Sequence, residues 1–466
     1  MSAKNAVIEA HDLTAVQAAT YVAEGKLSPL QLLDACFKQI DRLEPQIQAF
    51  VTIDRERALE AAYEREKDVK QGKALGHLHG VPIAIKDVFY TKDLLTTGCS
   101  RVYEKFIPTY DATAVRKLKA AGAIVLGKTW TTELASGDTG PTRNPYNLEH
   151  TPGGSSQGSA AAVAARMVPA ALGTQTVGST LRPASFTGCV GLKPTYGRIS
   201  RYGLIALAWS LDHVGVIVRS VEDAACLLEV LAGRDQHDST TSDRPVDRYS
   251  ASVKGQIESP RIGLIRDYFL GEHCDTAIRR HTEAAAQKLA QAGANVEEVN
   301  LPESFSIVRA AERVIYAAEV GAMHESAMRR DPELFRPRMR TAVQVGLLIP
   351  ASYYLQAQRL RQRFRRDMER IAVCYDVLMT PTTPTPAPKG LEDPGSAMFQ
   401  FPWSFTGLPT LSVPSGLTEN GLPLGIQLIA SSFSEARLLE VGTWCERAMN
   451  VHLYPALARQ STTGNT

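Results

Sequence analysis

The stretch TPGGSSQGSAAA, residues 151–162, places three glycines and three serines at the start of an alanine-rich run. A glycine-rich phosphate loop needs a Lys-Ser or Lys-Thr pair after its glycines, and none follows here. Residues 154–158 also fit the GxSxG pattern of a nucleophile elbow, which would make Ser156 the nucleophile. An elbow requires a hydrophobic strand directly before the serine, whereas TRNPYNLEHTPG is polar and contains two prolines. Neither motif therefore explains this segment.

Three further segments, read together with residues 151–162, give a third interpretation. They are HGVPIAIKDVF (79–89), GTQTVGSTLRPASFTGCVGLKPTYGRIS (173–200) and SRYGLIALAWSLDHVGVIVRSVEDAACLLEVLAG (200–233). With the C-terminal FPWSFTGLPTLSVPSG, they resemble the amidase signature family over nearly the whole chain. The resemblance implies an α/β protein: a single large α/β/α domain whose central mixed β-sheet is covered by helices.

The pattern of apolar residues is consistent with one α/β domain over residues 1–466. We divide it into N-terminal helices (8–75), a signature core (76–235), a more variable region (236–375) and a C-terminal return to the core (376–460). Apolar spacing predicts helices throughout 12–72, with Ser28 and Pro29 as N-cap and first residue of one of them. Strands with a helical crossover are expected at 79–89 and 121–130, and SAAAVAARMVPAAL (159–172) is expected to be a buried helix. Further strands are expected at 261–269, 294–302 and 375–384, and further helices at 276–292 and 351–372.

The family resemblance assigns the chemistry to three residues. It implies that Ser179 is the nucleophile, that Ser155 passes on its proton and that Lys86 is the base. Taken singly, these residues could be a helix cap, a turn residue and a surface ion-pair partner. Lys86, however, ends the apolar run VPIAI, where an uncompensated ammonium would be costly.

A lysine acts as a base only when it is neutral. At the reference pKa of about 10.4, on the order of one lysine in a thousand is neutral near neutral pH, so the site must lower the pKa. Activity is therefore expected to rise toward alkaline pH. Ser155 suits the relay because a hydroxyl donates and accepts a hydrogen bond at once, and in the family it follows a cis peptide, here Gly154–Ser155.

The turn before the nucleophile is expected to supply an oxyanion hole. The backbone N–H groups of Thr176, Val177 and Gly178, together with that of Ser179, would face the oxygen that becomes negative. The sequence departs here from the commonest family pattern, with Gln175 in place of Asp, Val177 in place of Gly and Thr180-Leu181 in place of Ile-Arg. Because Val177 is β-branched, we expect this turn to avoid positive φ.

Three further residues are expected to bind substrate. Arg182 would bind a carboxylate, since guanidinium matches carboxylate bidentately, although a structural ion pair explains it equally well. Ser136 and Gly137, with parts of residues 306–410, are expected to form the pocket walls. The expected substrate is a small polar or carboxylated amide, which would release ammonia or an amine.

Two alternative functions stay open. One is the glutaminase (A) subunit of a tRNA-dependent amidotransferase, which KPTYGRISRYGL (193–204) resembles strongly. The other is a non-catalytic family member that acts as a binding protein. A metal site is not expected, because neither HExxH nor Cys/His ligand spacing occurs, and no cofactor is expected.

The composition of the chain limits which binding partners and which cellular location we expect. The 51 Lys and Arg nearly balance the 49 Asp and Glu, so neither nucleic acid nor a membrane is expected as a partner. The basic run RLRQRFRRDMER (359–370) is interpreted as a solvated helix face. Seven scattered cysteines and a first segment without an apolar core predict a cytoplasmic protein with reduced thiols. A homodimer is expected, and a further possibility is a small accessory subunit.

Overall fold

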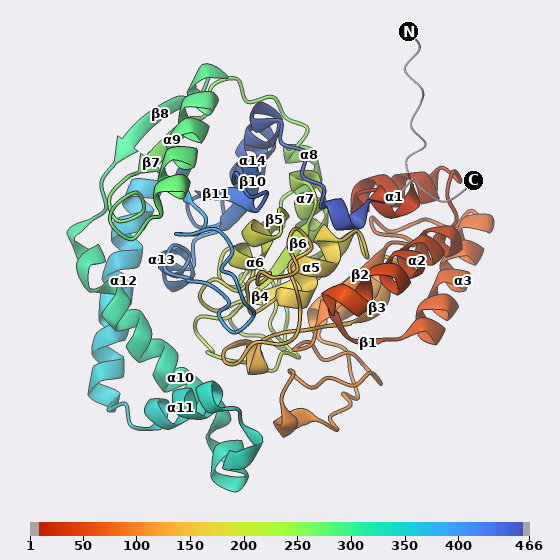
Figure 1. Ribbon diagram of the computed structural model, residues 1–466, viewed down its shortest axis with the longest axis horizontal. Coiled ribbons are helices and arrows are strands. Elements are labelled where there is room, and N and C mark those ends of the chain that lie inside the picture. The colour runs from red at the N-terminus through yellow and green to blue at the C-terminus, as the bar shows by residue number, and fades with distance from the viewer. Residues whose placement is uncertain (1–8, 460–466) are drawn as a thin grey trace.

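The computed structural model describes residues 9–459 and contains one mixed sheet of eleven strands (Figure 1). Their order across the sheet is β1-β3-β2-β4-β6-β5-β10-β11-β9-β7-β8. The predicted α/β class with a central mixed sheet is confirmed. The strands are β1 (Phe50–Ile53), β2 (Pro82–Lys86), β3 (Ile124–Thr129), β4 (Ala170–Gln175), β5 (Val190–Lys193), β6 (His213–Val218), β7 (Arg261–Ile265), β8 (Asn295–Val299), β9 (Val377–Pro381), β10 (Thr410–Leu417) and β11 (Pro423–Ile429).

Helices flank this sheet. They are α1 (Ala15–Ala23), α2 (Pro29–Ile47), α3 (Arg55–Lys70), α4 (Thr113–Ala120), α5 (Gln157–Ala164), α6 (Leu181–Phe186), α7 (Val221–Leu231), α8 (Tyr249–Ser252), α9 (Thr276–Gln291), α10 (Val308–Arg330), α11 (Pro337–Leu347), α12 (Ala351–Ala372), α13 (Phe401–Thr406) and α14 (Glu435–Met449). Within residues 9–459, none of them combines the length and the apolarity needed to cross a membrane.

The parallel pair β2 and β3, joined through α4, forms the predicted crossover. The predicted start of α2 is also confirmed, because the Ser28 hydroxyl accepts from the Leu30 N–H and Pro29 is the first helical residue. All five residues of β2 are buried, and β2 lies between β3 and β4, both parallel to it. Lys86 is therefore carried by the interior of the sheet, not by a surface loop.

Two segments differ from the sequence prediction. Residues 12–72 are not all helical, because Phe50–Ile53 forms β1, which pairs antiparallel with the edge of β3. The stretch 159–172 is not one helix either. Its helix ends at Ala164, Arg166 takes a positive φ of 62°, and β4 begins at Ala170. Pro169 rules out one continuous helix over this stretch, since it has no N–H to donate and disfavours helical geometry at the residue before it.

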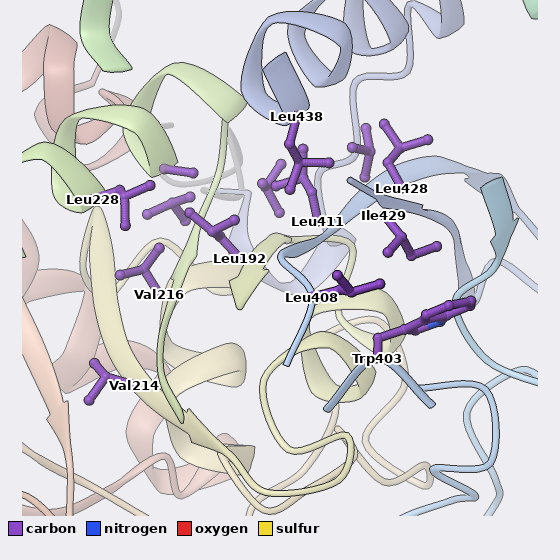
Figure 2. Close-up of a cluster of buried hydrophobic side chains, with 14 of the residues drawn as sticks. Leu192, Val214, Val216, Leu228, Trp403, Leu408, Leu411, Leu428, Ile429 and Leu438 are labelled. Atoms are coloured by element: carbon purple, nitrogen blue, oxygen red, sulfur yellow. The ribbon is translucent and has the colours of Figure 1, made fainter. Parts of the chain in front are cut away.

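The C-terminal segment joins the centre of the sheet. Figure 2 shows one cluster of buried side chains that connects β5 and β6 with β10, β11, α7, α13 and α14. Its labelled members are Leu192, Val214, Val216, Leu228, Trp403, Leu408, Leu411, Leu428, Ile429 and Leu438. Segments more than two hundred residues apart in the sequence thus share a core. At one end of the molecule, α10 packs against both α11 and α12, and the three helices form an arm (Figure 1). The division of the chain into four regions stays a prediction.

Candidate active site

The candidate site lies at the carboxyl ends of β2 and β4. Lys86 is the last residue of β2, and Thr174 is the second-last of β4. Because the two strands are parallel neighbours, both residues reach the same edge of the sheet. The Lys86 Nζ donates to Ser155 Oγ and to Thr174 Oγ1, each at 2.7 Å. The structure therefore brings the expected base and the expected relay serine into direct contact.

The loop that carries Ser155 is held from both sides. Its Gly154–Ser155 bond is cis, as the family resemblance implies. The Ser155 carbonyl accepts from the Thr132 N–H at 3.2 Å, and the N–H of the next residue, Ser156, donates to the Ser179 carbonyl at 3.1 Å. That last bond ties the two serine loops together, so Ser155 and Ser179 lie on adjacent strips of backbone.

Ser179 lines a cavity and is 7% exposed. Among residues 9–459, no protein group is hydrogen-bonded to its hydroxyl, and none accepts from the backbone N–H groups of Thr176, Val177, Gly178 or Ser179. An oxyanion hole needs backbone N–H groups that are free of protein acceptors, and these four groups meet that condition. The hydrogen bond between Ser179 and Ser155 that a proton relay needs is not made in this structure.

Gln175 organises this turn. Its side-chain Oε1 accepts from the N–H groups of Thr180 and Leu181, both at 3.0 Å, where α6 begins. Its Nε2 donates to Ser404 Oγ at 3.0 Å, and Ser404 Oγ donates to the Val177 carbonyl at 2.8 Å. A neutral amide can thus cap the helix and anchor the turn at once. Val177 is not among the described residues with positive φ, as expected from its branching.

Burial controls the protonation of Lys86. The side chain is 0% exposed, and desolvation lowers its pKa to about 7, while the carboxylate of Asp212 opposes this shift. Asp212 is itself held in place, because its Oδ1 accepts from Thr176 Oγ1 at 2.6 Å and its Oδ2 accepts from the N–H groups of Leu207 and Ala208. A substantial fraction of Lys86 is therefore neutral near pH 7, which a base requires.

The cavity beside Ser179 has a volume of about 290 Å³. Its walls come from the nucleophile turn, from the loop around Ser136, from α10 and from the loop before α13. They are formed by Ala135, Ser136, Thr176, Val177, Gly178, Ser179, Arg182, Leu207, Arg309, Glu312, Arg313, Tyr316, Pro394 and Ala397. Ser136 is hydrogen-bonded to the Tyr316 hydroxyl. Gly137 is not among these residues and instead lies against Met339 of α11.

Arg182 lies on the cavity wall and holds backbone. Its Nε and Nη2 donate to the Gly154 carbonyl, at 3.0 and 2.6 Å, and its Nη1 donates to the Gly395 carbonyl. Burial lowers its pKa to about 10, so the guanidinium stays charged at neutral pH. Arg182 therefore links the loop of the relay serine to the loop before α13.

The sequence model of the Amidase family matches residues 31–439. The chain belongs to the amidase family. It is similar to a glutamyl-tRNA(Gln) amidotransferase subunit of Lachnospira eligens, with 39% identity over 94% of this chain and 98% of the relative. A chain from a vestigial protein complex that reveals the evolutionary origins of an s-triazine catabolic enzyme superposes with a TM-score of 0.88 and 33% identity, over 94% of this chain and 99% of that one. The native peptide amidase of Stenotrophomonas maltophilia superposes with a TM-score of 0.81 and 30% identity, over 96% of this chain and 99% of that one.

These likenesses confirm the expected reaction class: this amidase is an amidohydrolase. Within residues 9–459, no group of three or more His, Cys, Asp or Glu is placed to hold a metal ion.

The basic run 359–370 lies on α12. One of its arginines, Arg361, stabilises the fold, because its guanidinium donates to the Phe405 carbonyl and to Ser210.

Several site residues of this amidase were not identified from the sequence. Thr174 lies inside GTQT, and Asp212 inside SLDHVG, yet neither was assigned a role. The α10 residues on the cavity wall, Arg309, Glu312 and Tyr316, could be placed only within the broad range 306–410. Their spacing of three and four residues resembles that of any helix face, so only tertiary packing reveals that this face meets Ser179.

Proposed function

We propose that this amidase cleaves a small polar or carboxylated amide through an acyl-enzyme on Ser179. The contact between Lys86 Nζ and Ser155 Oγ is the observation that carries the proposal, because it joins a lysine of lowered pKa to a hydroxyl next to the nucleophile turn. A cavity of about 290 Å³ is at the small end of the ~300–1,000 Å³ usual for ligand pockets, which favours a small substrate.

The proposed reaction has two steps. Ser179 Oγ attacks the carbonyl carbon while its proton passes to Ser155, whose own proton passes to neutral Lys86. The N–H groups of residues 176–179 stabilise the oxygen that becomes negative. The relay then protonates the leaving nitrogen, the C–N bond breaks, and ammonia or an amine departs. Water subsequently attacks the ester on Ser179 by the same relay, releasing the carboxylic acid and restoring Ser179.

Substrate contacts are part of the same proposal. Ser136 faces the cavity together with Tyr316, which supports a polar contact to the substrate. Gly137 would act indirectly, because its lack of a side chain lets the loop of Ser136 pack closely against Met339. Arg182, which the sequence suggested as either a carboxylate ligand or a structural group, is proposed to act here through its hydrogen bonds to the Gly154 and Gly395 carbonyls.

The glutaminase subunit of an amidotransferase is the second candidate, and the 39% identity to an amidotransferase subunit favours it. The two functions differ in what the purified chain does alone. We expect the chain by itself to release ammonia from succinamate, and faster than from glutamine. Hydrolysis confined to glutamine, or absent until tRNA and another subunit are added, would establish the second candidate.

Assembly and location complete the proposal. We propose a homodimer. A small accessory subunit is a second candidate partner, and the vestigial protein complex described for one structural neighbour favours it. Light scattering of the purified chain measures the dimer, and co-purification from the source cells tests the accessory partner. A cytoplasmic location is supported by seven cysteines that are all free thiols.

A further inference from the structure

The cavity beside Ser179 is lined by three guanidinium groups, those of Arg182, Arg309 and Arg313, and by one carboxyl group, that of Glu312. This excess of positive charge favours an anionic substrate. The three arginines differ in how many of their hydrogen-bond donors are already used. That difference indicates which one is available to a ligand.

Of the three arginines, Arg182 makes the most hydrogen bonds within the protein. It is 8% exposed, and its Nε, Nη1 and Nη2 all donate to backbone carbonyls, two of them to Gly154 and one to Gly395. Turning its guanidinium toward a substrate would leave the Gly154 carbonyl, next to the relay serine, without these donors. Such a loss is costly for a buried group.

Arg309 also contacts other side chains of the protein, those of Glu312 and Phe401. Its Nη1 lies 3.3 Å from Glu312 Oε2, and its guanidinium lies over the Phe401 ring, 4.9 Å from the ring centre. Burial raises the pKa of Glu312 to about 7, and the two neighbouring arginines oppose that shift. When Glu312 is ionised, its charge is offset by Arg309, so this pair adds little net field to the cavity.

Arg313 makes no direct contact of this kind, although its charge acts on Glu312 together with that of Arg309. Its side chain is exposed, and within residues 9–459 no hydrogen bond, ion pair or ring contact involves its guanidinium. It lies on α10 four residues after Arg309 and three before Tyr316, a spacing that places all three on one helix face. That face forms the wall of the cavity into which Ser179 opens.

We propose that Arg313 binds the carboxylate of the substrate and thereby selects amides that carry one. The five N–H donors of its fork match a carboxylate bidentately. Because Arg313 and Ser179 line the same cavity of about 290 Å³, one small substrate can present its carboxylate to Arg313 and its scissile carbonyl to Ser179. The inference rests on the proposed function and narrows its substrate to short, carboxylated amides.

The test compares two substrates that differ only in the charged group, succinamate and butanamide. The measured quantity is the ratio of their kcat/KM values. In Arg313→Gln we expect this ratio to fall about tenfold to a hundredfold, the usual effect of losing a charge-assisted hydrogen bond. Arg313→Lys should recover part of the ratio. Added salt should lower it in the wild type, since exposed charges are screened.

Two controls make the result specific. Arg329→Gln removes another exposed arginine of α10, one that is not on the cavity wall and pairs with Glu325, and it should keep the wild-type ratio. Arg182→Ala should lower kcat/KM for both substrates by similar factors, because its guanidinium holds the Gly154 carbonyl. An unchanged ratio in Arg313→Gln, or a lowered ratio in Arg182→Ala alone, would overturn the assignment.

The inference can fail separately from the proposed function. If the wild type shows no preference for succinamate, while Ser179→Ala is inactive on both substrates, the carboxylate assignment is wrong and the nucleophile assignment stands. If Ser179→Ala retains hydrolysis, the proposed function itself is wrong. Unchanged far-UV circular dichroism and Tm of Arg313→Gln would show that the variant is folded.

Discussion

Lys86 Nζ and Ser155 Oγ lie 2.7 Å apart in the interior of the protein, and both side chains are almost fully buried. Ser155 reaches this place on a loop between β3 and α5, while Lys86 ends the interior strand β2, which lies between β3 and β4. The sheet thus holds the base rigidly, and the loop brings the relay to it.

The pH dependence of hydrolysis should follow Lys86. Burial lowers its pKa to about 7, and only the neutral amine accepts a proton, so kcat/KM should rise with pH through about 7 and then level off. Lys193 is a matched control, because burial also lowers its pKa to about 7 while its Nζ donates to the Leu408 carbonyl at 2.6 Å. Lys193→Met should keep the midpoint; a midpoint that moves in this variant would argue against Lys86.

Replacing Lys86 with Met should change how stability depends on pH. The folded pKa of about 7 lies below the ordinary 10.5, so between these values the unfolded wild type binds one more proton, and its stability rises with pH. The free energy of unfolding of Lys86→Met, relative to wild type, should therefore fall by up to about 1.4 kcal/mol per pH unit above pH 7. Urea unfolding at pH 7 and 9 measures this; a constant difference would mean that the pKa is not lowered.

Thr174→Val should lower kcat and change the pH at which activity rises, here called the pH limb. The variant removes the second oxygen that accepts from Lys86 Nζ. Because an ammonium makes stronger hydrogen bonds than an amine, losing this acceptor should lower the pKa of Lys86 further and move the limb to lower pH. We expect kcat to fall about tenfold. Thr174→Ser, which keeps the hydroxyl, should stay close to wild type in both respects, and an unmoved limb in Thr174→Val would count against this role.

Gln175→Leu should damage both the fold and the nucleophile turn. It leaves the buried N–H groups of Thr180 and Leu181 without an acceptor, a loss of about 1–3 kcal/mol for each. The free energy of unfolding should fall by about 2 kcal/mol or more, and kcat should fall with it. Ser404→Ala removes the hydrogen bonds of Ser404 Oγ with Gln175 Nε2 and the Val177 carbonyl but keeps the cap of Thr180 and Leu181, and it should cost less. Full activity in Gln175→Leu would show that the turn does not need this cap.

The parts of this amidase that could be predicted from the sequence are those fixed by local chemistry. The apolar run before Lys86 predicts a buried strand that ends at this residue. The contact between Lys86 and Ser155, by contrast, was implied only by the resemblance to the amidase signature family. The strand Phe50–Ile53 was missed because four residues between two long helices give little periodic signal, and its pairing with β3 is a tertiary contact. The same holds for Arg313, since nothing local distinguishes an arginine that faces a cavity from one that faces water. Gln175 was recognised as a departure, but its hydrogen bonds to Thr180 and Leu181 appear only in the folded turn.

Ser179 as the acylated residue is the central claim, and peptide mapping of a trapped intermediate tests it most directly. The protein is mixed with p-nitrophenyl acetate, quenched in acid, digested and analysed by mass spectrometry. We predict an acetyl group on Ser179 in the wild type and none in the Ser179→Ala variant. An acetyl group on Ser155 or Ser156 in its place, or one that persists in the active-site peptides of Ser179→Ala, would contradict the account.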